Sequence, residues 1–308
     1  MLYLSVPELI AEAANFVPAI KDAGVEATFE RLSQIQDQVV VVKYGGNAMT
    51  DEALQQQFAQ DVALLTAMGV PVVVVHGGGP QIDAMLKRVG IEGQFVQGMR
   101  VTDADTMGIV DGVLCGNVQG QIVNLINQVG KSYGVRAVGM SGKDGRMVRV
   151  KRMHLPDVQN PEIEHDIGLV GEVIGVDTAL IENLLDGDFL PVISPIAADD
   201  HGVTHNVNAD VAAGEIACAM HANKLMLLTN IKGVLDKQGE LIANIDSASA
   251  TALKADGTLY GGMLPKIDSA LDAAQRGVGA VHIVDGRVPH VLLQCLLTDA
   301  DVGTAIRV

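Results

Sequence analysis

The chain has 308 residues, 48% of them hydrophobic, and a formal net charge of −16. Such an acidic surface disfavours nucleic acid and anionic membranes, and the absence of Trp with 3% aromatic content disfavours a base-stacking platform. No apolar run approaches the length of a membrane span, and no basic signal segment opens the chain. We therefore expect a cytoplasmic protein with no nucleic-acid or membrane partner, whose three scattered cysteines are reduced.

The first 35 residues predict an amphipathic helical extension. Ser5-x-x-Glu8 resembles a capping box. The apolar face that follows consists of Leu9, Ala13, Phe16, Val17 and Ile20. After Gly24 there is a second short apolar stripe, made of Phe29, Leu32 and Ile35. Two interpretations stay open, packing against its own domain and docking on another subunit.

From residue 36 on, short β-branched runs alternate with helical stretches. The runs occupy 39–42, 72–75, 190–193, 225–228 and 280–284. Runs without polar alternation are typical of strands covered on both faces, as in a parallel sheet. Residues 51–68 and 265–277 have helical spacing, so the pattern predicts an α/β sandwich. Residues 143–174 and 199–207 resemble hairpins and predict some antiparallel strands.

Three glycine-rich loops follow or precede these elements, at 43–47, 76–80 and 261–266. Glycines let the backbone approach a ligand closely, and a following helix N-terminus favours anions. Two of the loops carry a lysine, Lys43 or Lys266, which in so acidic a protein indicates phosphate binding. GxxxxGK[ST], GxGxxG, HRD and DFG are missing, which excludes the Walker-type and protein-kinase signatures and disfavours a nicotinamide-dependent oxidoreductase.

Two further features have a structural and a functional interpretation. Asn206, Asn208 and Asp210 precede a small-residue helix, and they could cap it or point together into a cleft. Arg100 could be a surface residue or a bidentate clamp for a carboxylate.

Seven segments occur in order from about residue 38 to the C-terminal part: VKYGGNAM (42–49), HGGGPQI (76–82), GMRVTD (98–103), NVNAD (206–210), LTNIKGVLD (228–236), GGMLPK (261–266) and VHIVDGR (281–287). Together they resemble the amino acid kinase family, and within it the members that phosphorylate N-acetylglutamate. The resemblance implies a three-layer αβα sandwich with a mainly parallel central sheet, preceded by an N-terminal helix. Residues 1–35 would form the extension, and 36–308 the kinase domain, with 36–195 binding the acylated amino acid and 196–308 binding ATP.

The resemblance also assigns roles to single residues. Lys43 and Lys266 would flank the transferring phosphoryl group, and Asp210 would organise the two lysines. The substrate would be bound by Gly78, Gly79, Arg100 and Asn206, with Arg100 on its α-carboxylate. ATP would be bound by Gly45, Gly46, Thr229, Asn230, Gly233, Val234, Leu235, Tyr260 and Gly261. Mg²⁺ would arrive with ATP, and no side chain is assigned to it.

The implied activity is ATP-dependent phosphorylation of the γ-carboxylate of N-acetyl-L-glutamate to N-acetyl-L-glutamyl 5-phosphate, in arginine biosynthesis. One alternative is a kinase for a related N-acylated amino acid, either N-acetylaminoadipate or a carrier-bound one. Aspartate and uridylate kinases fit residues 98–103 and 206–210 less well. Another is a non-catalytic sensor of the same fold, which the presence of Lys43, Asp210 and Lys266 disfavours.

The extension resembles that of hexameric, arginine-inhibited members, so we expect a homo-oligomer, a hexamer built as a trimer of dimers. The resemblance also suggests a nitrogen-signalling PII protein as a partner. Cys295 stands where inhibited relatives usually carry a glutamate for the effector's cationic end, and Leu32 stands near the place of a characteristic tyrosine. We therefore expect arginine inhibition to be weak.

Overall fold

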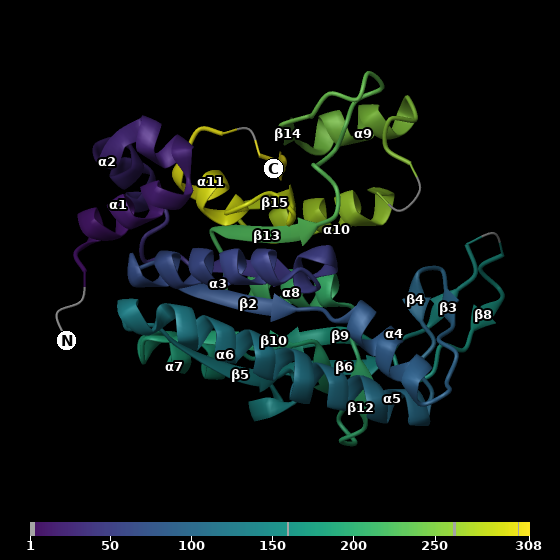
Figure 1. The fold of residues 1–308 in the computed structure, drawn as a ribbon. Coiled ribbons are helices and arrows are strands. Elements are labelled where there is room, and N and C mark those ends of the chain that lie inside the picture. Colours follow the sequence, from purple (N-terminus) through teal and green to yellow (C-terminus); the bar gives the residue numbers. More distant parts are fainter. Residues whose placement is uncertain (1–3, 159, 261–262, 301) are drawn as a thin grey trace.

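An eight-stranded sheet lies between two layers of helices in the computed structural model, which describes residues 4–158, 160–260, 263–300 and 302–308 (Figure 1). The strand order is β14-β16-β15-β13-β1-β2-β10-β5, and neighbours are parallel except β15 and β16. The strands are β1 (Val40–Tyr44), β2 (Val72–His76), β5 (Arg136–Ser141), β10 (Phe189–Ser194), β13 (Lys224–Thr229), β14 (Asn244–Ile245), β15 (Ala280–Asp285) and β16 (Thr304–Ile306). The predicted three-layer sandwich with a mainly parallel sheet is confirmed.

Alternating residues of the central strands feed two separate cores. Val40 and Val42 of β1 pack in one core, and Val41 packs in the other. The first core is covered by α3 (Glu52–Ala67), α4 (Gly79–Arg88), α5 (Ala104–Asp111), α6 (Gln119–Gly130) and α11 (Val291–Leu297). The second is covered by α7 (Ala179–Asp186), α8 (Ala209–Ala219), α9 (Ser247–Ala255) and α10 (Met263–Gln275). Both faces of central strands such as β2 and β15 are buried, which explains the uninterrupted apolar runs.

A smaller mixed sheet and two ribbons lie beyond the main sheet. The smaller sheet has the order β12-β11-β6-β9, with antiparallel pairs β11–β12 and β6–β9. Its strands are β6 (Val148–Arg152), β9 (Gly171–Val176), β11 (Ile196–Ala198) and β12 (Thr204–Asn206). The ribbons pair β3 (Phe95–Val96) with β4 (Met99–Arg100), and β7 (Leu155–Pro156) with β8 (Glu164–His165). The predicted antiparallel strands are thereby confirmed.

The N-terminal extension contains two helices, and the second is kinked at Gly24 (φ +81°), the point after which the sequence pattern placed a second apolar stripe. They are α1 (Val6–Phe16) and α2 (Pro18–Ser33), separated by Val17 in an extended conformation. Pro18 explains the break, because a residue before proline is pushed out of the helical region. Leu9, Ile10 and Ala13 are buried in the first core, so the extension packs on its own chain.

The remaining helical turns are η1 (Gly46–Met49), η2 (Gly112–Val118), η3 (Lys131–Tyr133) and η4 (Asp144–Arg146). Through the π-helix η2, α5 and α6 join into one helical run, Ala104–Tyr133, which by length and composition alone could cross a membrane. The sequence pattern predicts no apolar run long enough to cross a membrane, so this helical run differs from the prediction. A core helix passes the same test, and α6 packs on β5 and β10 of the sheet.

Candidate active site

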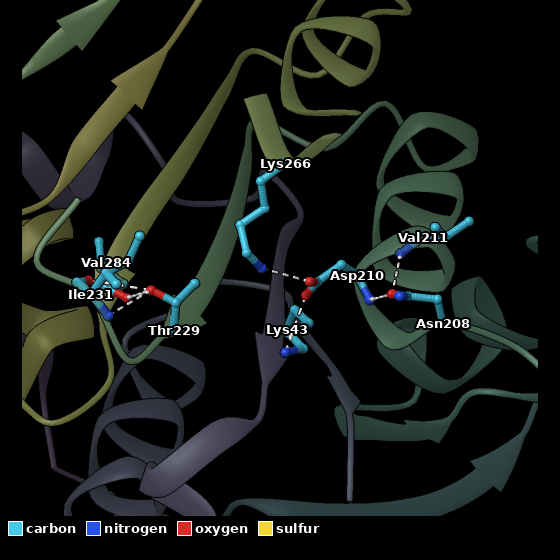
Figure 2. A network of polar contacts seen from close by, with 8 residues as sticks. All are labelled: Lys43, Asn208, Asp210, Val211, Thr229, Ile231, Lys266 and Val284. Carbon is cyan, nitrogen blue, oxygen red and sulfur yellow. Dashed lines mark hydrogen bonds and ion pairs between the residues drawn. The ribbon is translucent and has the colours of Figure 1, made fainter. Parts of the chain in front are cut away.

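Two lysines and an aspartate meet between the carboxyl end of β1 and the first turns of α8 and α10 (Figure 2). Asp210 Oδ1 lies 3.1 Å from Lys43 Nζ, and Asp210 Oδ2 accepts a hydrogen bond of 2.8 Å from Lys266 Nζ. Burial alone would raise the pKa of Asp210, but the two ammonium groups outweigh it, and this pKa lies below its ordinary value. The carboxylate is therefore ionised and holds two cations side by side.

Asn208 fixes the start of the helix that carries Asp210. Its side-chain oxygen accepts hydrogen bonds from the backbone N–H groups of Asp210 (2.8 Å) and Val211 (3.4 Å), as an N-cap does. Asn206, Asn208 and Asp210 also line one cavity. Both interpretations of this segment, the cap and the shared cleft, therefore hold.

The ends of neighbouring side chains lie close to the backbone at three glycines of the first two loops. A Cβ on Gly45 would lie 2.6 Å from Lys43 Nζ, and a Cβ on Gly78 would lie 2.5 Å from Leu114 Cδ2. Gly46 has a φ of +71°, and its Cβ would lie 2.6 Å from Asn230 Oδ1. These loops therefore place the backbone against the lysine, against η2 and against the loop after β13.

A cavity of about 320 Å³ brings together the residues predicted to bind the substrate. Gly78, Gly79, Arg100 and Asn206 all line it, together with Lys43 and Asp210. Gly45 and Gly46, predicted to contact ATP, line this cavity too. A buried threonine connects the two polar substrate candidates: Thr102 Oγ1 accepts from Asn206 Nδ2 at 3.3 Å and donates to the carbonyl oxygen of Arg100 at 3.0 Å.

Arg100 is 8% exposed and is held by its neighbours inside the wall of this cavity. Its Nη2 donates to Asp83 Oδ1 at 2.6 Å, and the Phe95 ring lies 4.6 Å from its guanidinium carbon. Its Nη1 is buried and has no hydrogen-bond partner among the described residues. The surface interpretation of Arg100 is therefore wrong, and its polar capacity is only partly used.

A second cavity, of about 1010 Å³, is lined by most of the predicted nucleotide residues, namely Asn230, Gly233, Val234, Leu235 and Tyr260. Thr229 lies behind it: its Oγ1 accepts from the N–H of Ile231 at 3.2 Å and lies 3.3 Å from the carbonyl oxygen of Val284, to which it can donate. Figure 2 shows the contacts of Thr229 with Ile231 and Val284 in the same view as Lys43, Asp210 and Lys266. Gly261 falls outside the described residues.

The lysine–aspartate cluster borders the first cavity, and neighbouring residues connect it to the second. Lys43 and Asp210 line the first, whereas Lys266 belongs to α10, whose first residue, Met263, lines the second. Gly46 lines the first and abuts Asn230 of the second. Such an arrangement can hold two anionic ligands on opposite sides of paired cations.

Three residues in or next to these cavities had no role predicted from the sequence: Arg287 and Lys232, which line the second cavity, and Asp83, which lines neither cavity but pairs with Arg100. Asp83, one turn into the helix after the second glycine loop, carried no pattern that distinguishes it from a solvent-exposed carboxylate. Arg287 and Lys232 line the second cavity, and Arg287 donates to the carbonyl oxygen of Asn230 at 2.8 Å. Both cations lie inside segments used for the family resemblance, so their charge was the signal that could have found them.

Proteins of similar sequence cover nearly the whole chain. The acetylglutamate kinase of Methylibium petroleiphilum is 50% identical over 302 residues, covering 98% of each chain. The acetylglutamate kinase of Bordetella avium is 52% identical over 294 residues, covering 96% of this chain and 97% of that one.

Among solved structures, the fold is similar to that of N-acetylglutamate synthase from Neisseria gonorrhoeae complexed with coenzyme A and N-acetyl-glutamate. The TM-score is 0.77 at 23% identity, over 92% of this chain and 62% of that longer one. Carbamate kinase from Giardia lamblia bound to AMP-PNP has a TM-score of 0.61 at 17% identity, over 88% and 98% of the two chains. These two likenesses concern the fold alone.

The sequence profile described as the amino acid kinase family matches residues 38–285, which include Lys43, the Gly78 loop, Arg100, Asp210 and Lys266. Together with relatives at about half identity over nearly full length, this match settles the ancestry of the chain. The chain belongs to the amino acid kinase family.

Proposed function

We propose that the chain transfers the γ-phosphoryl group of ATP to the γ-carboxylate of N-acetyl-L-glutamate, giving N-acetyl-L-glutamyl 5-phosphate and ADP, a step of arginine biosynthesis. The observation that carries the proposal is the pair of lysines joined by Asp210 at the edge of the first cavity, with the start of the Lys266 helix lining the second. The names of the relatives at 50–52% identity support the choice of substrate.

The chemistry needs cations and no general base. A γ-carboxylate is ionised at neutral pH, so its oxygen can attack the γ-phosphorus directly while the bond to the bridging oxygen breaks and ADP leaves with the electron pair. The difficulty is to bring two anions together and to stabilise charge on the transferring group. We assign that task to Lys43 and Lys266, with Asp210 keeping both ammonium groups in place.

The two substrates are assigned to the two cavities. We propose that the smaller cavity holds the acylated amino acid, with Arg100 on the α-carboxylate and Asn206, Gly78 and Gly79 orienting the rest. The larger cavity would hold the nucleotide. This division follows the predicted halves 36–195 and 196–308, except that residues 206–210 belong to the second half and line the first cavity.

Mg²⁺ would supply counter-charge on the ATP phosphates. Both oxygens of Asp210 are already within ion-pair distance of a lysine, which leaves this carboxylate poorly suited to ligate a metal. We therefore propose that phosphate oxygens and water ligate the ion.

The exposed side of the N-terminal extension bears on the assembly. We infer a cytoplasmic homohexamer built as a trimer of dimers, with a nitrogen-signalling PII protein as a candidate partner. Val25 and Phe29 of α2 support the assembly, because they are 44% and 45% exposed after the extension has packed on its own chain. Light scattering at several concentrations tests the hexamer, and a molecular mass at or below that of a dimer would refute it.

Hydroxylamine trapping tests the activity. The protein is incubated with MgATP and hydroxylamine, and N-acetylglutamate, N-acetylaminoadipate and aspartate are offered in separate reactions. We expect the hydroxamate mainly from N-acetylglutamate. A preference for N-acetylaminoadipate would shift the assignment to a longer substrate, and no hydroxamate from any of the three would favour a non-catalytic sensor.

A further inference from the structure

Three neighbours fix the guanidinium group of Arg100. Asp83 Oδ1 binds Nη2 at 2.6 Å, the Phe95 ring covers one face, and the backbone at Gly93 is so near that a Cβ there would lie 3.1 Å from Nη1. Asp83 comes from α4, and Arg100 and Phe95 come from the β3–β4 ribbon. The pair therefore joins the helix after the second glycine loop to the ribbon.

The two side chains of the Arg100–Asp83 ion pair are buried to different extents. The Arg100 side chain is 7% exposed, whereas that of Asp83 is 55% exposed. A buried guanidinium needs acceptors for its donors. Among the residues that the structure describes, Asp83 is the one acceptor side chain that reaches it, and Nη1 has no hydrogen-bond partner. An arriving carboxylate would satisfy the remaining donor capacity of Arg100.

We propose that Asp83 is a positioning residue for the substrate: by holding Nη2 it orients the Arg100 guanidinium so that the remaining donors bind the α-carboxylate. This inference rests on the proposed function and extends it to a residue that touches Arg100. It differs from a general stabilising role because it acts on one carboxylate of one substrate.

The test compares Asp83→Ala and Asp83→Asn with the wild type in the hydroxamate assay. For Asp83→Ala we expect the KM for N-acetylglutamate to rise about 10- to 100-fold, the scale of one hydrogen bond to a charged group, while kcat and the KM for ATP stay nearly unchanged. Asp83→Asn keeps an oxygen that can accept from Nη2, so it should restore much of the affinity.

The α-amide of N-acetylglutamate separates this role from a structural one. It keeps the γ-carboxylate but lacks the α-carboxylate, so its KM should be high in the wild type and should change little in Asp83→Ala. Asp166→Asn is the matched control, because Asp166 pairs with Arg152 Nη2 at the same 2.6 Å and lines neither described cavity.

Each outcome decides the proposal. An unchanged or lower KM for N-acetylglutamate in Asp83→Ala overturns it, and a lower one would mean that Asp83 competes with the substrate for Arg100. Equal rises of KM for the acid and its α-amide, or a loss of kcat with early thermal unfolding, would also overturn it in favour of a structural role. If the wild type phosphorylates none of the offered acids, the proposed function fails first and the role of Asp83 with it.

Discussion

Lys266 Nζ donates a hydrogen bond of 2.8 Å to Asp210 Oδ2, although the two residues are 56 positions apart in the chain. Asp210 lies in the first turn of α8, and Lys266 lies in the first turn of α10. Helix starts at the same edge of the sheet direct both side chains toward Lys43 at the end of β1. The geometry of the three charges therefore depends on the fold and not on any local segment.

Removing the Lys266 ammonium should reduce turnover and leave the fold intact. We expect Lys266→Ala to lower kcat about 10²- to 10³-fold, the scale for losing one preorganised donor to the transition state. The hydroxamate assay measures kcat, and circular dichroism checks the fold. Lys151→Ala, which removes a lysine from a surface ion pair with Glu172, is the control. An unchanged kcat in Lys266→Ala would remove this lysine from the mechanism.

Asp210→Asn should destabilise the protein in a pH-dependent way. Without the carboxylate the two ammonium groups face each other, and we expect a loss of about 2 kcal/mol in the free energy of unfolding near neutral pH, somewhat less than for a fully buried pair. The pKa of Asp210 is lowered in the folded state, so its stabilisation is complete above the ordinary pKa of 3.8 and is lost as the pH falls through the folded value.

Urea unfolding of wild type and Asp210→Asn at several pH values checks this sign. The difference between them should be largest near pH 7 and should shrink in acid, below the unfolded pKa of the carboxyl group. A difference that grows toward acid would show that the carboxylate does not receive its stabilisation from the lysines.

Most of the sheet was predictable because strands buried on both faces leave uninterrupted apolar runs such as 72–75. The glycine loops were predictable for a related reason, since a position such as Gly78 admits no Cβ beside Leu114. The break between α1 and α2 was missed, although Pro18 provides a local signal for it.

The pairing of Asp83 with Arg100 could not be predicted from the sequence. It depends on the distance between α4 and the β3–β4 ribbon in the folded chain. Neither the spacing of hydrophobic residues nor the residues of the turns carry information about that distance. The same holds for the hydrogen bonds of the Thr229 hydroxyl, which join its own loop to β15.

Gly46→Ala should disturb the contact between Gly46, which lines the first cavity, and Asn230, which lines the second. A Cβ at this position would lie 2.6 Å from Asn230 Oδ1 and would sit on a backbone with φ of +71°, so both a clash and strain of about 1–2 kcal/mol are expected. We predict a higher KM for ATP and a lower melting temperature. Gly202→Ala isolates the strain, because Gly202 has a φ of +79° and open space around it. Equal effects of the two substitutions would show that the approach of Asn230 is unimportant.

Arginine should inhibit the enzyme weakly, because the surroundings of Cys295 suit no additional cation. The Cys295 thiol lies 3.4 Å from His282 Nδ1, and burial raises the pKa of Cys295 to about 11, so it carries no charge at neutral pH. Burial lowers the pKa of His282, and the nearby charges of Lys224 and Arg307 lower it further, to about 3. A guanidinium ligand would meet two cations and a neutral thiol there, with the carboxylate expected of inhibited relatives missing. Initial rates measured against increasing L-arginine, at N-acetylglutamate near its KM, should therefore stay almost flat, and half-inhibition at micromolar arginine would contradict this reading of the cluster.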